Sequence, residues 1–274
     1  MANLIIPSVY SKTLREKMEG RIKLAQLAFS MPLDEFKQVG ETVIFPKFRM
    51  IGDTEDVVKG TPLVPEQLQQ DSSKAVVMHK GKAIRVYDYD DKTAMGNFIE
   101  EANTQQAIVF ARTLDNELFK EALKSPLKSP VAEDKKITAT EINNALQLFG
   151  DEQDTEDFAG ILIHSLLIPS MIAMPEFTEA SKLYNETGNG IQRNGLLGYF
   201  RGIPVFVTNT MMDQNECVTL IVKKNSLAYM LKKDFTVEEE REAKLRATDI
   251  VADMMFATKQ VNDEGIVVVR KTIA

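Results

Sequence analysis

The sequence has no tryptophan, a single cysteine and only two histidines in 274 residues. One cysteine cannot form an intramolecular disulfide, which is typical of proteins that fold in a reducing compartment. The histidines, His79 and His164, each stand in a strand-like run with no second ligand at metal-binding spacing. Because a zinc site needs three or four ligands, we predict no metal site and no cofactor, and we interpret Cys217 and both histidines as structural.

The short motifs that mark common enzyme sites are also missing. The glycines at Gly188 and Gly190 are not followed by the glycine that a dinucleotide-binding loop requires, since Arg193 stands in its place. There is no Walker-type phosphate loop and no Gly-x-Ser-x-Gly elbow. The carboxylates of residues 238–242 form a run that is typical of a solvated surface. The sequence therefore favours a protein that is not an enzyme.

Excess positive charge and long apolar runs are likewise absent. The formal net charge is −7, whereas proteins that grip nucleic acid carry basic surfaces that neutralise phosphates. The longest apolar stretch, Gly160–Met174, is interrupted by a histidine, two serines and a proline, while a membrane helix needs about 20 apolar residues. Residues 1–10 do not have the pattern of a secretory signal. We expect neither a membrane partner nor tight binding to DNA.

Residues 1–40 predict an arm that contains an amphipathic helix. Leu14, Met18, Ile22 and Ala25 recur at helical spacing and would form one apolar face. Lysine and arginine outnumber aspartate and glutamate by eight to five within residues 1–50, although the whole chain is acidic. This basic start is either a solvated helix face or a contact for an acidic partner during assembly. The candidate contact residues are Lys12, Arg15, Lys17 and Arg21.

Residues 41–90 predict a long β-hairpin with an exposed tip. Glu41–Phe48 is rich in β-branched and aromatic residues, and Pro46 places that strand at an edge because proline cannot donate a ladder hydrogen bond. Lys74–Asp90 would return, with Gly81 at a bulge or bend. A two-stranded hairpin alone is marginally stable, so we expect another copy of the chain to support it. The candidate inter-subunit contacts are Pro46, Arg49, Asp53, Glu55, Asp56 and Lys59.

The remaining residues predict a mixture of helices and strands. A long helix over 91–125, capped by Asp91 or Thr93, ends at the Ser-Pro-rich residues 125–130. A second helix over 138–149 has a capping box in Thr138 and Glu141. Residues 246–258 fit a helix or a strand equally well. Strands are predicted at 158–163, 203–208, 218–222, 235–240 and 265–270, a short helix at 168–174 and a loop at 185–198.

The order of these pieces resembles the Hong Kong 97-type coat fold of the tailed-bacteriophage major capsid proteins. The matching stretches are Gly40–Pro46, Lys80–Val86, Met95–Lys124, Gly195–Val205, Glu239–Glu242, Asp249–Asp253 and Gly265–Val268. The resemblance implies an α+β fold with five parts: an N-terminal arm (1–40), an extended β-hairpin loop (41–90), a spine helix of a peripheral domain (91–130), an axial domain (131–233) and return strands of the peripheral domain (234–274).

By implication, copies of the chain would assemble in the host cytoplasm into hexamers and pentamers of an icosahedral virion head. The shell would enclose double-stranded DNA without sequence-specific binding. A portal would take part, and the lack of a long coiled N-terminal extension implies a separate scaffolding protein, or none. Two alternatives stay open. One is an encapsulin-like compartment with the same fold and an enzyme cargo, and the other is a soluble hydrolase whose site the sequence does not reveal.

Overall fold

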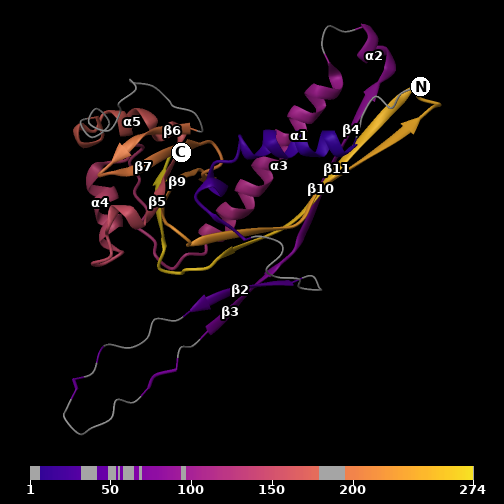
Figure 1. The fold of residues 1–274 in the computed structure, drawn as a ribbon. Coiled ribbons are helices and arrows are strands. Elements are labelled where there is room, and N and C mark those ends of the chain that lie inside the picture. The colour runs from indigo at the N-terminus through magenta and orange to yellow at the C-terminus, as the bar shows by residue number, and fades with distance from the viewer. Residues whose placement is uncertain are drawn as a thin grey trace.

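A computed structural model describes residues 7–31, 42–48, 54, 56–57, 65–67, 70–93, 97–178 and 195–273. Two sheets and one long helix organise these residues (Figure 1). The helix is α3, Phe98–Ala122, and at about 1.5 Å per residue it is about 37 Å long. It lies against both sheets and therefore acts as the spine of the molecule.

The first sheet has four strands in the order β1-β10-β11-β4. Its strands are β1 (Phe29–Met31), β10 (Leu227–Glu242), β11 (Ala247–Gln260) and β4 (Met78–Tyr87). The antiparallel pair β10 and β11 forms a long ribbon that reaches away from the second sheet (Figure 1). The ambiguous residues 246–258 are therefore strand, because Ile250, Ala252 and Met254 alternate into the core beneath α3.

The second sheet has six strands, ordered β12-β9-β5-β7-β6, with β8 paired to β9. These are β12 (Ile266–Thr272), β9 (Glu216–Lys223), β5 (Phe158–His164), β7 (Ile203–Thr208), β6 (Leu196–Phe200) and β8 (Met212–Asp213). One face of this sheet packs with α3, and the other packs with α4 (Ala139–Gln147) and α5 (Ile168–Ile172). Burial on both faces explains why β5 and β9 are continuous apolar runs.

Several expectations from the sequence are confirmed, and the local chemistry explains why. Thr138 and Glu141 form the reciprocal capping box at the start of α4. Gly150 follows this helix with φ of 63°, a left-handed conformation that glycine adopts easily. The short helix and the strands predicted between 158 and 270 are also found. The strand predicted at 235–240 is the end of the longer β10, and β6 begins at Leu196, inside the predicted loop 185–198.

Other expectations need correction. The long helix begins at Phe98, because Asn97 caps it by accepting the Glu100 amide, and Asp88–Thr93 form a separate helix, α2. Gly81 is not a bulge: it pairs with Asp253 in an unbroken register, and a Cβ there would lie 3.4 Å from the Ala252 carbonyl oxygen. The strand β12 does not return to the sheet of β10 and β11. It pairs with β9, and its valines pack into the cores on the two faces of the six-stranded sheet.

The predicted return strand of the hairpin is in fact two strands with different partners. Residues Gln70–Val76 form β3, which pairs with β2 (Thr42–Phe48). After Val77 the chain continues as β4, which pairs with β11 over its full length. The side chains of Ile84 and Val86 pack into the core beneath α3, and this burial holds β4 in the four-stranded sheet. The projecting hairpin is therefore β2 and β3 alone.

Candidate functional site

The β2–β3 hairpin extends away from the two sheets and pairs with no other strand among the described residues (Figure 1). Val43, Phe45 and Ala75 pack against Ala228, Met230 and Ala257 of β10 and β11 in a small third core. The hairpin thus presents unpaired strand edges beyond its base, which is the arrangement that invites a second chain to add to it.

The candidate inter-subunit residues lie in or near this hairpin. The backbone of Pro46 lies in β2, opposite Ser72 of β3. Asp56 is exposed in the segment between the two strands. Arg49, Asp53, Glu55 and Lys59 lie outside the described residues. The role of all six in contacts between subunits therefore remains a prediction.

Phe45 is the side chain that anchors the hairpin, since it is fully buried against the four-stranded sheet. We expect Phe45→Ala to destabilise the attachment by about 3 kcal/mol, which corresponds to about a hundredfold faster opening. Hydrogen exchange of the β2 and β3 amides measures this. Ile44→Ala is the matched control, because Ile44 points to the opposite face and is 38% exposed. Equal exchange in both variants would contradict the anchoring role.

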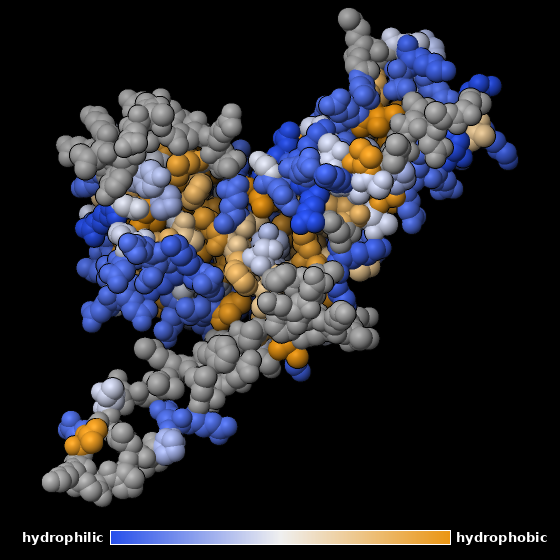
Figure 2. Space-filling view, in the orientation of Figure 1, coloured by the Kyte–Doolittle hydropathy of each residue, from blue (hydrophilic) through white to orange (hydrophobic). Residues whose placement is uncertain are grey.

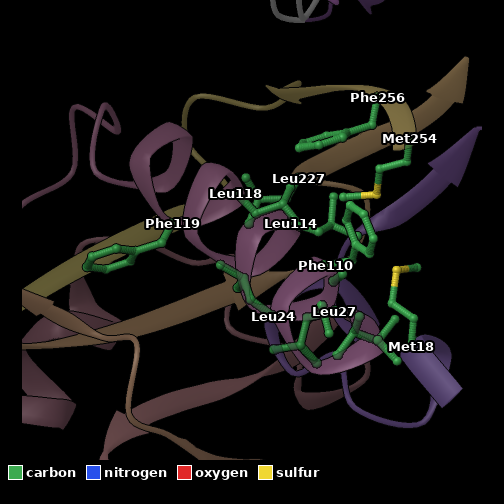
Figure 3. Close-up of a cluster of buried hydrophobic side chains, with 14 of the residues drawn as sticks. Met18, Leu24, Leu27, Phe110, Leu114, Leu118, Phe119, Leu227, Met254 and Phe256 are labelled. Carbon is green, nitrogen blue, oxygen red and sulfur yellow. The ribbon is translucent and has the colours of Figure 1, made fainter. Parts of the chain in front are cut away.

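The described part of the arm, residues 7–31, packs on the body, in contrast to the hairpin. Its helix α1, Pro7–Glu19, crosses α3, and the turn Leu24–Gln26 follows it against the same helix. Figure 3 shows Met18, Leu24 and Leu27 of the arm facing Phe110 and Leu114 of α3. Tyr10 Oη donates to Gln106 Oε1 over 2.8 Å, and Gln106 Nε2 donates in turn to the carbonyls of Lys82 and Ile250. The predicted apolar face is confirmed, but its partner is the chain's own spine.

The four candidate contact residues of the arm, which are all basic, have different surroundings. Lys12 and Arg21 are exposed, and Arg15 pairs with Glu19 at 2.9 Å. Lys17 is half-buried, and its Nζ donates to Thr104 Oγ1 of α3 over 2.9 Å. Lys12 and Arg15 line one shallow hollow, whereas Lys17 and Arg21 line a second one with residues from α3 and the six-stranded sheet. Contact of these residues with an acidic partner remains a prediction.

Asp115 is the residue of this region that the sequence did not reveal. It lies on the buried face of α3, and its carboxylate accepts the backbone amides of Lys23 (2.9 Å) and Ala25 (3.0 Å) from the arm. Burial disfavours its charge and raises its pKa to about 6, although these amides oppose that effect. The sequence did carry a signal for it: Asp115 shares the helix face of the apolar residues Ala111, Leu114 and Leu118, which is the face expected to be buried. Asp115 fixes the segment that follows α1 to the spine.

The two histidines and the single cysteine have different surroundings. His164 is buried, its Nδ1 accepts the Leu166 amide, and burial lowers its pKa. His79 instead lies beside Asp253 on the four-stranded sheet, at 2.8 Å. Burial also raises the pKa of the Cys217 thiol, which leaves it protonated. Among the described residues no group of three or more histidine, cysteine or acidic side chains could hold a metal ion, and none of their helices has the length and apolar character needed to cross a bilayer.

Known proteins resemble this chain along nearly its whole length. The "Major capsid protein" of Staphylococcus phage phiMR11 is 24% identical over 272 residues, which cover 98% of this chain and 94% of that protein. No family model matches the chain.

Solved structures from phages share the fold at low identity. A structure from Mycobacterium phage Che8 has a TM-score of 0.64 at 16% identity and covers 84% of this chain and 85% of its own. The capsid of cyanophage P-SCSP1u gives 0.66 at 13% identity, with 92% and 90% covered. The head of Helicobacter pylori bacteriophage KHP40 gives 0.67 at 9% identity, with 100% and 93% covered. The resemblance to the tailed-bacteriophage major capsid proteins is confirmed, and the chain has their Hong Kong 97-type fold.

Proposed function

We propose that this chain is the major capsid protein of a tailed bacteriophage. Many copies assemble into hexamers and pentamers and close an icosahedral head shell around double-stranded DNA. The role is structural rather than catalytic. The observation that carries the proposal is the β2–β3 hairpin. It extends from a well-packed body, and among the described residues no third strand pairs with it.

The physical basis of assembly is the burial of this hairpin on neighbouring copies. Apolar surface contributes about 25 cal/mol per Å² when it is removed from water, so repeated large interfaces outweigh the cost of ordering a loop. Closed symmetry gives each unpaired edge a defined partner and prevents open-ended growth. The match to the phage phiMR11 protein, which covers 98% of this chain, supports the same role for the whole chain.

The partners follow from this role. The chain's main partner is itself. A portal and a separate scaffolding protein take part during assembly in the host cytoplasm, and the finished protein is part of the virion. The exposed basic residues of the arm are the proposed contact for an acidic assembly partner.

The enclosed DNA is expected to bind only weakly, because the chain carries a net charge of −7. A shell that gripped phosphates strongly would immobilise the DNA it contains. Filter binding of the purified protein to duplex DNA at physiological salt should give a dissociation constant of about 1 μM or weaker, in the range of non-specific contacts. A nanomolar dissociation constant would contradict this part of the proposal.

Size-exclusion chromatography tests the function directly. A coat protein elutes as capsomers, shells or aggregates, whereas a soluble hydrolase elutes as a monomer or a small oligomer. An encapsulin-like compartment would also form shells, but the genes beside it would encode a peroxidase or a ferritin-like cargo instead of a terminase and a portal. Elution as a monomer at every concentration would contradict the proposal.

A further inference from the structure

A basic hollow lies where the arm, the spine helix and the six-stranded sheet meet. Its volume is about 640 Å³, and its walls come from α1 and the residues after it, from α3, and from Thr208–Thr210 at the end of β7. Four cationic side chains line it, against two carboxylates: Lys17, Arg21, Lys23 and Arg112 against Glu16 and Asp115. The arm and α3, two separate segments of the chain, thus bring positive charge to one concave surface.

The charges of this hollow are only partly compensated. The carboxylate of Asp115 is buried and already accepts backbone amides from the arm, so it is not available to the guanidinium groups. Arg21 and Arg112 are exposed, and no hydrogen bond or ion pair joins either side chain to another described residue. The two arginines of the hollow can therefore bind carboxylates of another molecule.

An acidic loop on the same chain has the complementary charge. Residues 151–157 carry five carboxylates in seven positions, and all seven residues are exposed. Glu152 pairs with Lys223, whereas the side chains of Asp154 and Glu156 have no partner among the described residues. In Figure 2 the part of the surface that carries α4 is covered by hydrophilic side chains. The loop that follows α4 is thus a solvated, negatively charged surface.

The fold keeps the hollow and the acidic loop apart within one molecule. Strands β5 and β7 run parallel, so the loop before Phe158 lies beside Gly202, where β7 begins. The hollow lies at the opposite end of β7, beyond Thr208. Five residue steps separate the two ends of this strand, which is roughly 17 Å. The two surfaces can meet only between different copies of the chain.

We propose that the basic hollow of one copy binds the acidic loop, residues 151–157, of a second copy. Because the two surfaces differ, the contact is head-to-tail, and a head-to-tail contact closes rings when its rotation permits. This inference deepens the proposed function, since it names a contact by which subunits of a shell recognise one another. Duplex DNA is a poorer occupant, because the site is a hollow rather than an open basic stripe.

Paired charge reversals test the contact. The hollow variant carries Arg21→Glu and Arg112→Glu, and the loop variant carries Asp154→Lys and Glu156→Lys. In either variant alone, the hollow and the loop carry charge of the same sign and repel each other. The protein concentration at half-association, measured by sedimentation velocity, should therefore rise at least about tenfold. A mixture of the two variants restores both complementary contacts and should associate like the unmodified chain. The matched control carries Lys135→Glu and Lys136→Glu, two exposed lysines elsewhere, and should behave like the unmodified chain.

The outcomes separate this contact from the proposed function. Thermal melting first verifies that each variant is folded, which is expected because all four reversed side chains are exposed. If the mixture does not regain the association of the unmodified chain, or if the control loses association equally, the contact is overturned even if the unmodified chain forms shells. Charge-dependent oligomers that never close into shells support the contact and overturn the shell. A monomeric unmodified chain contradicts both.

Discussion

A variant in which an Asn-Gly turn replaces Met50–Asp71 is expected to fold but to form no shells. The three apolar cores lie outside these residues, and the base of the hairpin keeps its anchor at Phe45. Residues 47–49 and the inserted Asn-Gly can form a five-residue loop, so that Pro46 and Ser72 stay opposite each other and β2 and the remainder of β3 can still pair. The variant loses only the extended segment that would overlap neighbouring subunits.

Two measurements check this expectation together. The circular dichroism spectrum and the melting temperature of the variant should stay close to those of the full chain, within a few degrees. Electron microscopy should show the yield of closed particles fall from most of the protein to none. Shells formed by the folded variant would show that overlap of the hairpin is not what holds subunits together.

The second large effect concerns the bond between the arm and the spine. Asp115→Ala removes the acceptor for the buried amides of Lys23 and Ala25. Buried donors without a partner cost about 1–3 kcal/mol each, so we expect a loss of about 3 kcal/mol in the free energy of unfolding. The arm should also open locally, and trypsin should cleave the variant at the lysines and arginines of residues 12–23 faster than it cleaves the unmodified chain.

The pKa of Asp115 adds a pH dependence with a defined sign. Burial raises this pKa to about 6, above the value of 3.8 in the unfolded chain, so the folded state binds the proton more tightly. The resulting stabilisation is complete below pH 4 and is lost as the pH rises through about 6. A shift of about two units corresponds to about 3 kcal/mol. Stability from this group should therefore fall between pH 4 and pH 7.

Asp115→Asn isolates this contribution, because the amide keeps one acceptor oxygen and does not titrate in this range. Urea unfolding of both proteins at pH 4 and pH 7 gives the difference in their free energies of unfolding. That difference should change by about 3 kcal/mol in the direction that disfavours the unmodified chain at higher pH. A difference that is independent of pH would contradict the assignment.

Local chemistry explains which elements could be predicted from the sequence. The capping box of Thr138 and Glu141 and the stripe formed by Leu14, Met18 and Ile22 depend on spacings of three and four residues, which are visible in one sequence. The apolar runs of β5 and β9 are visible for the same reason. The order of these elements was sufficient for the fold family, because that family is defined by order and length rather than by a catalytic motif.

Long-range partners could not be predicted, because several strands and helices could satisfy the same pattern. The apolar stripe of the arm needed a partner, but nothing in its spacing distinguished a neighbouring copy from the chain's own α3. Strand β4 pairs with β11, more than 160 residues away, for example through Ile84 and Ile250. The basic hollow combines the arm, α3 and the end of β7, so its cations come together only in the folded chain.

Negative-stain electron microscopy of the purified full-length protein tests the central claim most directly. If copies of this chain complete one another through the projecting hairpin, the images will contain closed particles of uniform diameter built from rings of subunits. A field of separate particles, each no larger than a few subunits at any protein concentration, would contradict the proposal.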